Sequence, residues 1–254
     1  MAVERLVPGG EAWAEFIGEH KNRYAFASRY VQGRRVLDAG CGVGYGSRML
    51  VGAGAAEVVA VDISDEALVV ARQKFQHSRI AFTKDDCQTL AEVSGPFEVV
   101  VALESLEHVV DAAAFVRRVA ELLAASGTFI VSTPNKLLSP GGNGHLVNPF
   151  HVVEFTPHEF QQLLSEHFSD IWMMGQRYTA ALASLYRLSA PSWSNPMMRV
   201  GRWLQRRRGR NTDFPFNPAT VPLTEADFVI TDTDPATAST LVAVCRGPRK
   251  NNGA

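Results

Sequence analysis

The run of residues 36–47, VLDAGCGVGYGS, constrains this chain more than any other segment. An apolar stretch leads into an acid and then into glycines at every second position. Glycine permits positive φ and lets a ligand approach the main chain without a Cβ in the way. The N–H groups that open a following helix also carry partial positive charge. The segment therefore predicts a strand, a turn and a helix that together bind a small nucleotide-like molecule.

The spacing of these glycines departs from the dinucleotide fingerprint G-x-G-x-x-G. Counted from Gly40, the third glycine is replaced by Tyr45, and counted from Gly42 it is replaced by Ser47. Asp38 would also repel a diphosphate, whereas an acid beside a helix N-terminus suits a ligand with both an ammonium group and a carboxylate. The segment therefore favours a cofactor that ends in an amino acid.

Composition limits the class of protein. The chain has 254 residues, 46% of them hydrophobic and 20% charged, which is typical of a globular α/β domain with a sizeable core. Its net charge of -1 gives no general reason to expect a polyanionic partner. Cys41, Cys87 and Cys245 lack metal-ligand spacing, and their odd number argues against a complete disulfide framework. Since no apolar run reaches about 18 residues, we expect a cytoplasmic chain without a transmembrane segment.

From residue 34 onward, strand-like and helix-like segments alternate. This pattern predicts a Rossmann-like, doubly wound α/β fold, with a mostly parallel seven-stranded sheet and helices on both faces. Several strands are β-branched runs with little alternation, as expected for strands buried on both faces. The expected strands are 35–39, 57–63, 79–84, 97–103, 127–133, 171–176 and 240–246, with 228–231 as an extra candidate, and the expected helices are 11–31, 46–51, 65–77, 112–125 and 157–167.

Residues 178–224 interrupt the alternation with short apolar pieces and several prolines, so we expect an insertion or lid before the last strand of a single domain, 1–254. The arginine-rich run Arg202–Arg210 lies within it, and could bind a phosphate-bearing substrate or, with its Trp and Leu, an anionic membrane. Alternatively, Arg202–Arg210 form a solvent-exposed face that binds no ligand. The polar tail, 248–254, is expected to be disordered.

Acidic residues follow each of the first four predicted strands, where ligands bind in an open α/β sheet. Asp38 ends the first strand. Asp62 ends the second, about 20 residues beyond the glycines, where an acid can accept hydrogen bonds from ribose hydroxyls. Residues 84–87, KDDC, follow the third strand, and residues 104–109, ESLEHV, follow the fourth. We therefore expect one binding site along the carboxyl edge of the sheet.

The D-x-G-x-G-x-G segment and the acids at successive strand ends resemble class I S-adenosylmethionine-dependent methyltransferases. The resemblance covers roughly residues 20–175 and implies S-adenosylmethionine as the cofactor. The residues that it implies as cofactor-binding are Tyr24, Asp38, Gly40, Cys41, Gly42, Gly44, Asp62, Ile63, Asp86, Cys87 and Glu104.

The same resemblance suggests roles for two of these segments. It places Asp86 against the adenine amino group and the next backbone N–H against the adenine ring. Asp85 is the alternative for this role, and is otherwise a solvated loop acid. Helices such as the first predicted one, which holds His20, Arg23 and Tyr24, fold over the cofactor in relatives. A core or surface role for Tyr24 is the alternative.

The segment ESLEHV resembles the E-x-x-E-H segment of the ubiquinone-biosynthesis type of O-methyltransferase, whose acids and histidine have been associated with a divalent cation. The corresponding metal candidates are Glu104, Glu107 and His108. Hard cations accept imidazole less readily than carboxylate, and metal-free relatives carry similar residues, so a metal is not favoured. The favoured interpretation has Glu104 fixing the cofactor and His108 acting as general base or orienting partner, with a structural role such as capping the helix after Asp111 as the alternative.

The segment N-P-F-H-x-x-E-F-T-P, which begins at Asn148, resembles a stretch that walls the acceptor pocket in small-molecule and sugar methyltransferases. His151 is therefore a second base candidate, although it could instead hydrogen-bond to Glu154. An oxygen acceptor benefits from a base more than a carbon or nitrogen acceptor does. We therefore expect O-methylation of a sugar, glycan or other small hydroxylated metabolite.

Other functions stay open. A lipid-linked substrate or RNA could be the acceptor, but nucleic acid is disfavoured because aromatic residues are not interleaved with the basic ones. An NAD-dependent oxidoreductase would explain the glycines and Asp62, but not Asp38, Asp86 or the Glu104–His108 segment. A binding module without catalysis is a further alternative.

Overall fold

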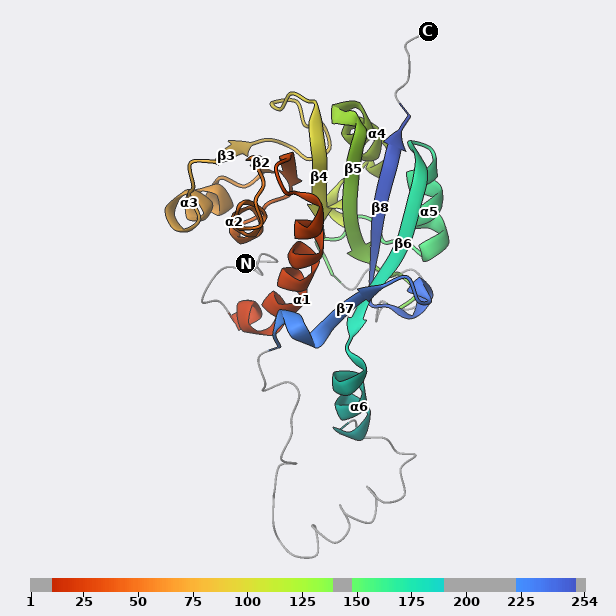
Figure 1. Cartoon of the computed structure of the whole chain (residues 1–254). Coiled ribbons are helices and arrows are strands. Elements are labelled where there is room, and N and C mark those ends of the chain that lie inside the picture. Colours follow the sequence, from red (N-terminus) through yellow and green to blue (C-terminus); the bar gives the residue numbers. More distant parts are fainter. Residues whose placement is uncertain (1–10, 139–147, 190–222, 250–254) are drawn as a thin grey trace, which may run out of the picture.

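The computed structural model describes residues 11–138, 148–189 and 223–249. Eight strands form one sheet in the order β3-β2-β1-β4-β5-β8-β6-β7 (Figure 1). The first five in this order are parallel, while β8 runs antiparallel to β5 and β6, and β7 runs antiparallel to β6. The strands are β1 (Arg35–Ala39), β2 (Glu57–Asp62), β3 (Ile80–Lys84), β4 (Phe97–Leu103), β5 (Leu123–Pro134), β6 (Phe168–Tyr178), β7 (Phe228–Thr231) and β8 (Thr240–Pro248).

Helices cover both faces of this sheet (Figure 1). The α-helices are α1 (Glu11–Ala27), α2 (Tyr45–Gly52), α3 (Asp65–Lys74), α4 (Ala112–Leu122), α5 (Pro157–Ser165) and α6 (Ala180–Ser189). Short 3-10 helices are η1 (Ser28–Tyr30), η2 (Leu106–His108), η4 (Glu225–Asp227) and η5 (Pro235–Thr237). Side chains of α1, α2 and α3 pack in one hydrophobic core, and those of α4 and α5 pack in another.

The central strands supply both cores because successive side chains point to opposite faces of a sheet. Val36 in β1 packs under α1, α2 and α3, whereas its neighbour Leu37 packs under α4 and α5. Both side chains are fully buried. The apolar runs VVAV in β2 and VVVAL in β4 follow from this two-sided burial, and the predicted doubly wound α/β fold is confirmed.

Three helices begin at side-chain caps that satisfy otherwise unpaired backbone N–H groups. The hydroxyl of Ser64 accepts a hydrogen bond from Ala67 N–H at the start of α3. Thr156 and Glu159 form a reciprocal capping box at the start of α5. Asp111 caps α4. The helix starts expected after Ser64 and Thr156 are therefore confirmed.

Some predicted boundaries were wrong. The sheet has eight strands among the described residues rather than seven, because 228–231 pairs with Gly175–Tyr178 as β7. The helix expected to reach residue 125 ends at Leu122, since Leu123 already pairs with Phe97 in the sheet. The tail expected to be disordered from 248 is partly ordered, because β8 includes Pro248 and Arg249 N–H donates to His167 O.

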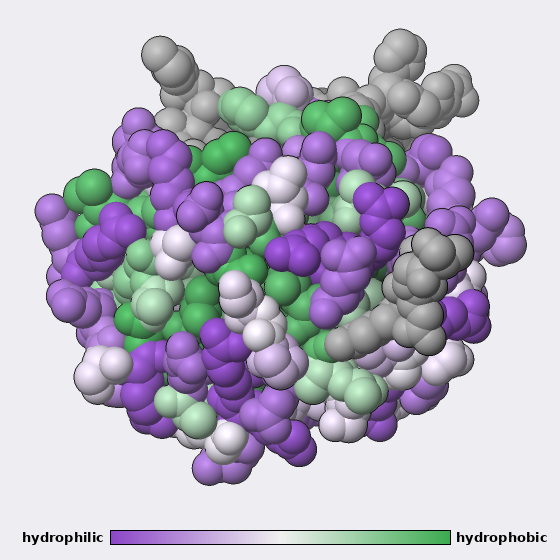
Figure 2. All heavy atoms as spheres, turned by 90° about the horizontal axis from the view of Figure 1, so that it is seen from above, coloured by the Kyte–Doolittle hydropathy of each residue, from purple (hydrophilic) through white to green (hydrophobic). Residues whose placement is uncertain are grey.

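The predicted insertion, 178–224, leaves the sheet at the end of β6 and begins with α6, which lies beyond the carboxyl ends of β5 and β6 (Figure 1). Residues 190–222, including Arg202–Arg210, lie outside the described residues. The opposite end of the sheet presents mostly hydrophilic side chains interspersed with hydrophobic ones (Figure 2). Among the described helices, none is both long and apolar enough to cross a membrane.

Candidate active site

Packing with neighbouring side chains requires two of the glycines after β1. A Cβ on Gly44 would lie 2.8 Å from the ring of Phe82, and a Cβ on Gly46 would overlap the ring of Tyr24. Gly44 also has a φ of 86°, in the left-handed region that glycine favours. These two glycines therefore serve the folding of the turn and the approach of α1, and the predicted contact of Gly44 with the cofactor stays a prediction.

Gly42 differs from them, because nothing in the described part of the chain lies within 4 Å of a Cβ built on it. Its φ is 53°, and its N–H donates a hydrogen bond to Asp62 Oδ2 over 2.9 Å. The open space over Gly42 is where a ligand can approach the main chain of this turn.

Asp62, at the end of β2, is mostly buried and organises the turn around it. Its Oδ1 accepts a hydrogen bond from Ser64 N–H over 2.9 Å, while Oδ2 accepts that of Gly42. A carboxylate has about four lone-pair positions, so each of its oxygens can accept more than one hydrogen bond. Ile63, between Asp62 and Ser64, is 55% exposed at the same edge.

Asp38 is fully buried, and both of its oxygens are used within the protein. Oδ1 accepts from the Tyr24 hydroxyl over 3.0 Å, and Oδ2 accepts from Ser47 Oγ over 2.5 Å. Burial raises the pKa of Asp38 to about 6, although these two hydrogen bonds act in the opposite direction. Asp38 thus joins α1, β1 and α2. Its predicted contact with the cofactor stays a prediction, and so does that of Tyr24.

The loop after β3 contains two acids with different surroundings. Asp85 is buried, and its carboxylate accepts from the backbone N–H groups of Asp86, Ala91 and Glu92. The expectation of a solvated Asp85 was therefore wrong, because this side chain holds the loop in shape. Asp86 is exposed and stays the candidate for the adenine amino group.

Cys41 and Cys87 lie close to the acidic residues at the ends of β1 and β2. Burial and the nearby Asp38 raise the pKa of the Cys41 thiol, and burial and the nearby Asp62 raise the pKa of the Cys87 thiol. Both therefore stay neutral thiols at physiological pH. Cys87 Sγ would lie 3.9 Å from a Cβ on Gly40, which places it against the glycine turn.

Glu104, directly after β4, has a φ of 52°, which is uncommon for a residue other than glycine and typical of functional loops. Its Oε1 accepts from Ser132 Oγ over 2.7 Å, and its Oε2 lies 3.8 Å from Arg23 Nη2. Arg23 is 1% exposed and donates from Nη1 to Gln176 Oε1. Its Nε and Nη2 have no hydrogen-bond partner among the described residues.

Arg23 was placed on the first helix by the sequence analysis, but no role was assigned to it. A buried guanidinium with unused donors beside a carboxylate is a candidate for binding a ligand carboxylate. The sequence feature that could have indicated a ligand-binding role for Arg23 is its position next to Tyr24, on a helix expected to fold over the cofactor. What sequence could not show is that Gln176, from β6, holds the guanidinium in place.

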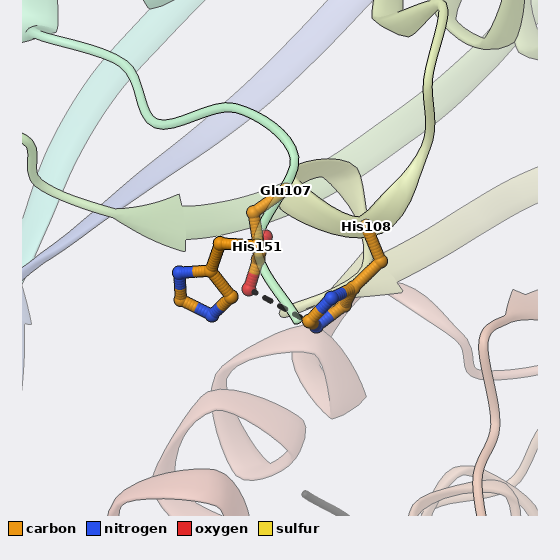
Figure 3. Close-up of side chains that lie close together, drawn as sticks. All are labelled: Glu107, His108 and His151. Carbon is orange, nitrogen blue, oxygen red and sulfur yellow. Dashed lines mark ion pairs between the residues drawn. The ribbon is translucent and has the colours of Figure 1, made fainter. Parts of the chain in front are cut away.

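Glu107, His108 and His151 form a second cluster (Figure 3). One ligand atom from each lies within 4.8 Å of the others, and the two imidazole ring centroids are 5.1 Å apart. Glu107 is buried, and its backbone carbonyl accepts from Val152 N–H over 2.8 Å, which joins η2 to the segment that carries His151. Burial and the nearby Glu104 raise the pKa of Glu107.

Hydrogen-bond partners assign the neutral tautomer of each histidine. His108 Nδ1 lies 3.1 Å from the Phe150 carbonyl oxygen, which only accepts, so Nδ1 carries the proton and Nε2 keeps the lone pair. His151 Nδ1 lies 2.9 Å from Glu154 Oε1, as the alternative role for His151 predicted. His151 Nε2 lies 2.9 Å from Asn148 Nδ2, so its lone pair accepts from this amide. His108 therefore fits the role of base better than His151 does.

Of the three predicted metal candidates, Glu107 and His108 come together, but Glu104 is not part of their cluster. Glu104 faces Ser132 and Arg23, while His151 takes its place beside Glu107 and His108. One carboxylate and two imidazoles suit a magnesium-type cation poorly, because such ions prefer oxygen ligands. Both ring nitrogens of His151 also have partners within the protein. The residues as arranged do not fit this cation, and no step below uses one.

The doubly wound sheet, with the open glycine turn and the carboxylates at the ends of β2 and β4 along one edge, is the arrangement of a class I methyltransferase fold. Residues 36–127 match the family model described as a methyltransferase domain. The resemblance found in the sequence is confirmed: the chain carries a class I S-adenosylmethionine-dependent methyltransferase domain.

Named relatives agree with this assignment. A Mycobacterium tuberculosis protein named as a probable S-adenosylmethionine-dependent methyltransferase is 34% identical over 68% of this chain and 62% of its own length. A ubiquinone biosynthesis O-methyltransferase of Azorhizobium caulinodans is 37% identical over 46% of this chain and 47% of its own. The chain thus spans at most 62% of these curated relatives.

Solved structures share the fold. An S-adenosylmethionine-dependent methyltransferase from Archaeoglobus fulgidus has a TM-score of 0.58 and 18% identity, covering 93% of this chain and 94% of its own. The cyclase SpnF has a TM-score of 0.55 and 13% identity, covering 90% of this chain and 82% of its own. Because a cyclase shares this fold, the fold alone does not determine the reaction.

Proposed function

We propose that this protein transfers a methyl group from S-adenosylmethionine to a hydroxyl group of a sugar, glycan or other small hydroxylated metabolite. The observation that carries the proposal is the position of Glu104 and His108. Glu104 lies directly after β4 in the cofactor half of the site, and η2 brings His108 four residues later beside the segment of Phe150 and His151. A cofactor-facing acid and a base-competent imidazole therefore share one short segment.

The cofactor would lie along the ends of β1, β2, β3 and β4. Its amino-acid end would bind Arg23 through the carboxylate and Glu104 through the ammonium group, since the buried Arg23 and the partly exposed Glu104 form a pair of opposite charge. Asp62 would accept from the ribose hydroxyls. Asp86 would accept from the adenine amino group, with the Cys87 N–H donating to the ring. The open face of Gly42 allows the close approach that this pose needs.

S-adenosylmethionine, when bound, would supply the methyl group as part of a sulfonium. His108 Nε2 would take the proton that the acceptor hydroxyl releases as it receives the methyl group. Glu107 Oε1 lies 3.9 Å from His108 Nε2, beside the position of that proton. Positioning of the two reactants and exclusion of water supply most of the acceleration.

The names of the relatives support a small-molecule acceptor, since a ubiquinone biosynthesis O-methyltransferase also acts on oxygen by its name. Arg202–Arg210 would suit an acceptor that carries phosphate, such as a nucleotide-sugar or a lipid-linked glycan. Cytoplasmic location is part of the proposal, supported by the three cysteines, all of which are free thiols.

A methyl-transfer screen tests the proposal. S-adenosylmethionine labelled at the methyl group would be incubated with sugars, nucleotide-sugars, phenols and RNA, using Asp62→Ala as a cofactor-binding control. We expect label in a hydroxylated small molecule and strongly weakened S-adenosylhomocysteine binding in Asp62→Ala. Tight NAD binding without a response to S-adenosylhomocysteine would contradict the cofactor assignment. Transfer to RNA alone would contradict the acceptor class.

A further inference from the structure

The side chain of Gln88 connects the loop after β3 to the segment that carries His108. Gln88 Oε1 accepts hydrogen bonds from the backbone N–H groups of Val110, over 3.1 Å, and Asp111, over 3.2 Å. The backbone N–H of Gln88 donates to Asp86 Oδ1 over 2.8 Å. One residue thus contacts both the adenine candidate and the backbone two residues after His108.

Val110 depends on this contact more than its neighbours do. Its side chain is 79% exposed, so side-chain packing does little to hold the backbone at this position. The η2 turn before it closes with hydrogen bonds from His108 N–H to Ser105 O over 3.2 Å and from Val109 N–H to Leu106 O over 3.4 Å. The side-chain carbonyl of Gln88 therefore adds a restraint on the backbone where the His108 segment leaves η2.

A second side chain, from α4, connects the segment after His108 back to the loop after β3. Arg118 in α4 donates to Thr89 O over 3.2 Å and to Leu90 O over 3.0 Å. Leu90 is fully buried with a φ of 43°, a conformation that a leucine adopts only where its surroundings impose it. Two independent sets of hydrogen bonds therefore connect the loop 86–90 to the segment 106–118.

We propose that Gln88 is a positioning residue that couples occupation of the adenine end of the cofactor site to the placement of His108. The inference rests on the proposed function, because it takes Asp86 as the adenine contact and His108 as the base. Adenine bound at Asp86 fixes the turn of residues 86–90. The hydrogen bonds from Val110 and Asp111 to Gln88 then restrain the backbone at these two residues, and with it the position of His108. By linkage, an acceptor bound beside His108 strengthens cofactor binding by the same factor.

The test compares the wild type with Gln88→Met, Gln88→Glu and Glu92→Gln. Methionine has a similar length but no acceptor for the two N–H groups, whereas glutamate keeps an oxygen there. Glu92 is an exposed residue of the same loop and serves as the matched control. Calorimetry with S-adenosylhomocysteine measures cofactor affinity, amide hydrogen exchange reports on Val110 and Asp111, and steady-state rates are taken at saturating cofactor.

We expect S-adenosylhomocysteine to slow amide exchange at Val110 and Asp111 in the wild type and in Glu92→Gln. In Gln88→Met the ligand still binds, but this slowing is lost and kcat falls about tenfold or more, because a displaced His108 is poorly oriented toward the acceptor. Gln88→Glu restores both readouts. Wild-type binding of S-adenosylhomocysteine without any change at Val110 and Asp111, or an unaltered response in Gln88→Met, would overturn the coupling alone. Absence of binding to the wild type would overturn the proposed function and the coupling together.

Discussion

The hydroxyl of Tyr24 donates a 3.0 Å hydrogen bond to Oδ1 of Asp38, which fixes the first helix to the strand that leads into the glycine turn. The bond is fully enclosed, since Asp38 is 0% exposed and Tyr24 only 4% exposed. An acid that was expected to face a ligand is therefore part of the packing between α1, β1 and α2. Its burial has consequences that stability measurements can detect.

The first prediction concerns pH. Burial raises the folded-state pKa of Asp38 from 3.8 to about 6, so the folded protein keeps a proton that the unfolded chain has already released in this range. The resulting stabilisation is complete below the unfolded pKa and is lost as the pH rises through 6. It amounts to on the order of 3 kcal/mol. Urea unfolding between pH 4 and pH 7 should show a decline in the wild type that is shallower in Asp38→Asn. Identical slopes in the two proteins would contradict the buried titration.

The second prediction separates the two histidines. His108→Gln removes the proposed base, so kcat should fall about a hundredfold or more, while S-adenosylhomocysteine binding stays within twofold. His151→Gln should have a smaller effect on kcat, because both ring nitrogens of His151 already bind Asn148 and Glu154. Initial rates at saturating substrates measure both variants. A larger loss in His151→Gln would transfer the role of base to His151.

The third prediction concerns Arg23. Arg23→Met removes the buried guanidinium, and S-adenosylhomocysteine affinity should fall at least about tenfold, as expected for losing a charge-assisted hydrogen bond. Methylthioadenosine, which lacks the amino acid, should bind both proteins equally. Asn22→Ala is the matched control, because Asn22 also bonds Gln176 from α1 but carries no charge. Equal losses for both ligands would indicate a folding defect and contradict carboxylate binding by Arg23.

The fourth prediction contrasts two glycines. In Gly46→Ala the new methyl group would overlap the ring of Tyr24. The substitution should therefore lower the free energy of unfolding by about 1–3 kcal/mol when no ligand is present. Gly42→Ala meets no neighbouring atom, so its stability cost should be about 1 kcal/mol from the positive φ, while S-adenosylhomocysteine binding should be strongly weakened. Thermal unfolding and calorimetry distinguish these effects. Full cofactor affinity in Gly42→Ala would show that no ligand approaches that position.

The fifth prediction concerns metals. The cluster of Glu107, His108 and His151 has a single carboxylate, and His151 is held by Asn148 and Glu154. Turnover should therefore change little after treatment with a chelator and removal of the chelator–metal complex. Loss of activity that magnesium restores, with other divalent ions as comparison, would establish a metal site here after all.

Local sequence patterns predicted most of the fold. The segments expected as strands at 35–39 and 97–103 are β1 and β4 with the same bounds, and the Val-rich part of β4 is the apolar signal typical of a strand buried on both faces. The boundaries that failed depend on distant partners. β5 begins at Leu123, before the predicted start at residue 127, because Leu123 pairs with Phe97. Residues 228–231 form a strand because they pair with the edge of the sheet at β6.

By itself, the sequence determined the class of protein: glycine spacing, an acid before the glycines and acids at the next strand ends are local signals that the α/β connectivity places at one edge. Only the tertiary structure decided what each acid does. Asp38 and Asp85 are enclosed by partners from other segments, and His151 rather than Glu104 lies beside His108. The physical reason is that burial and hydrogen-bond partners of these side chains come from residues far away in the chain, and these set both pKa and availability to a ligand.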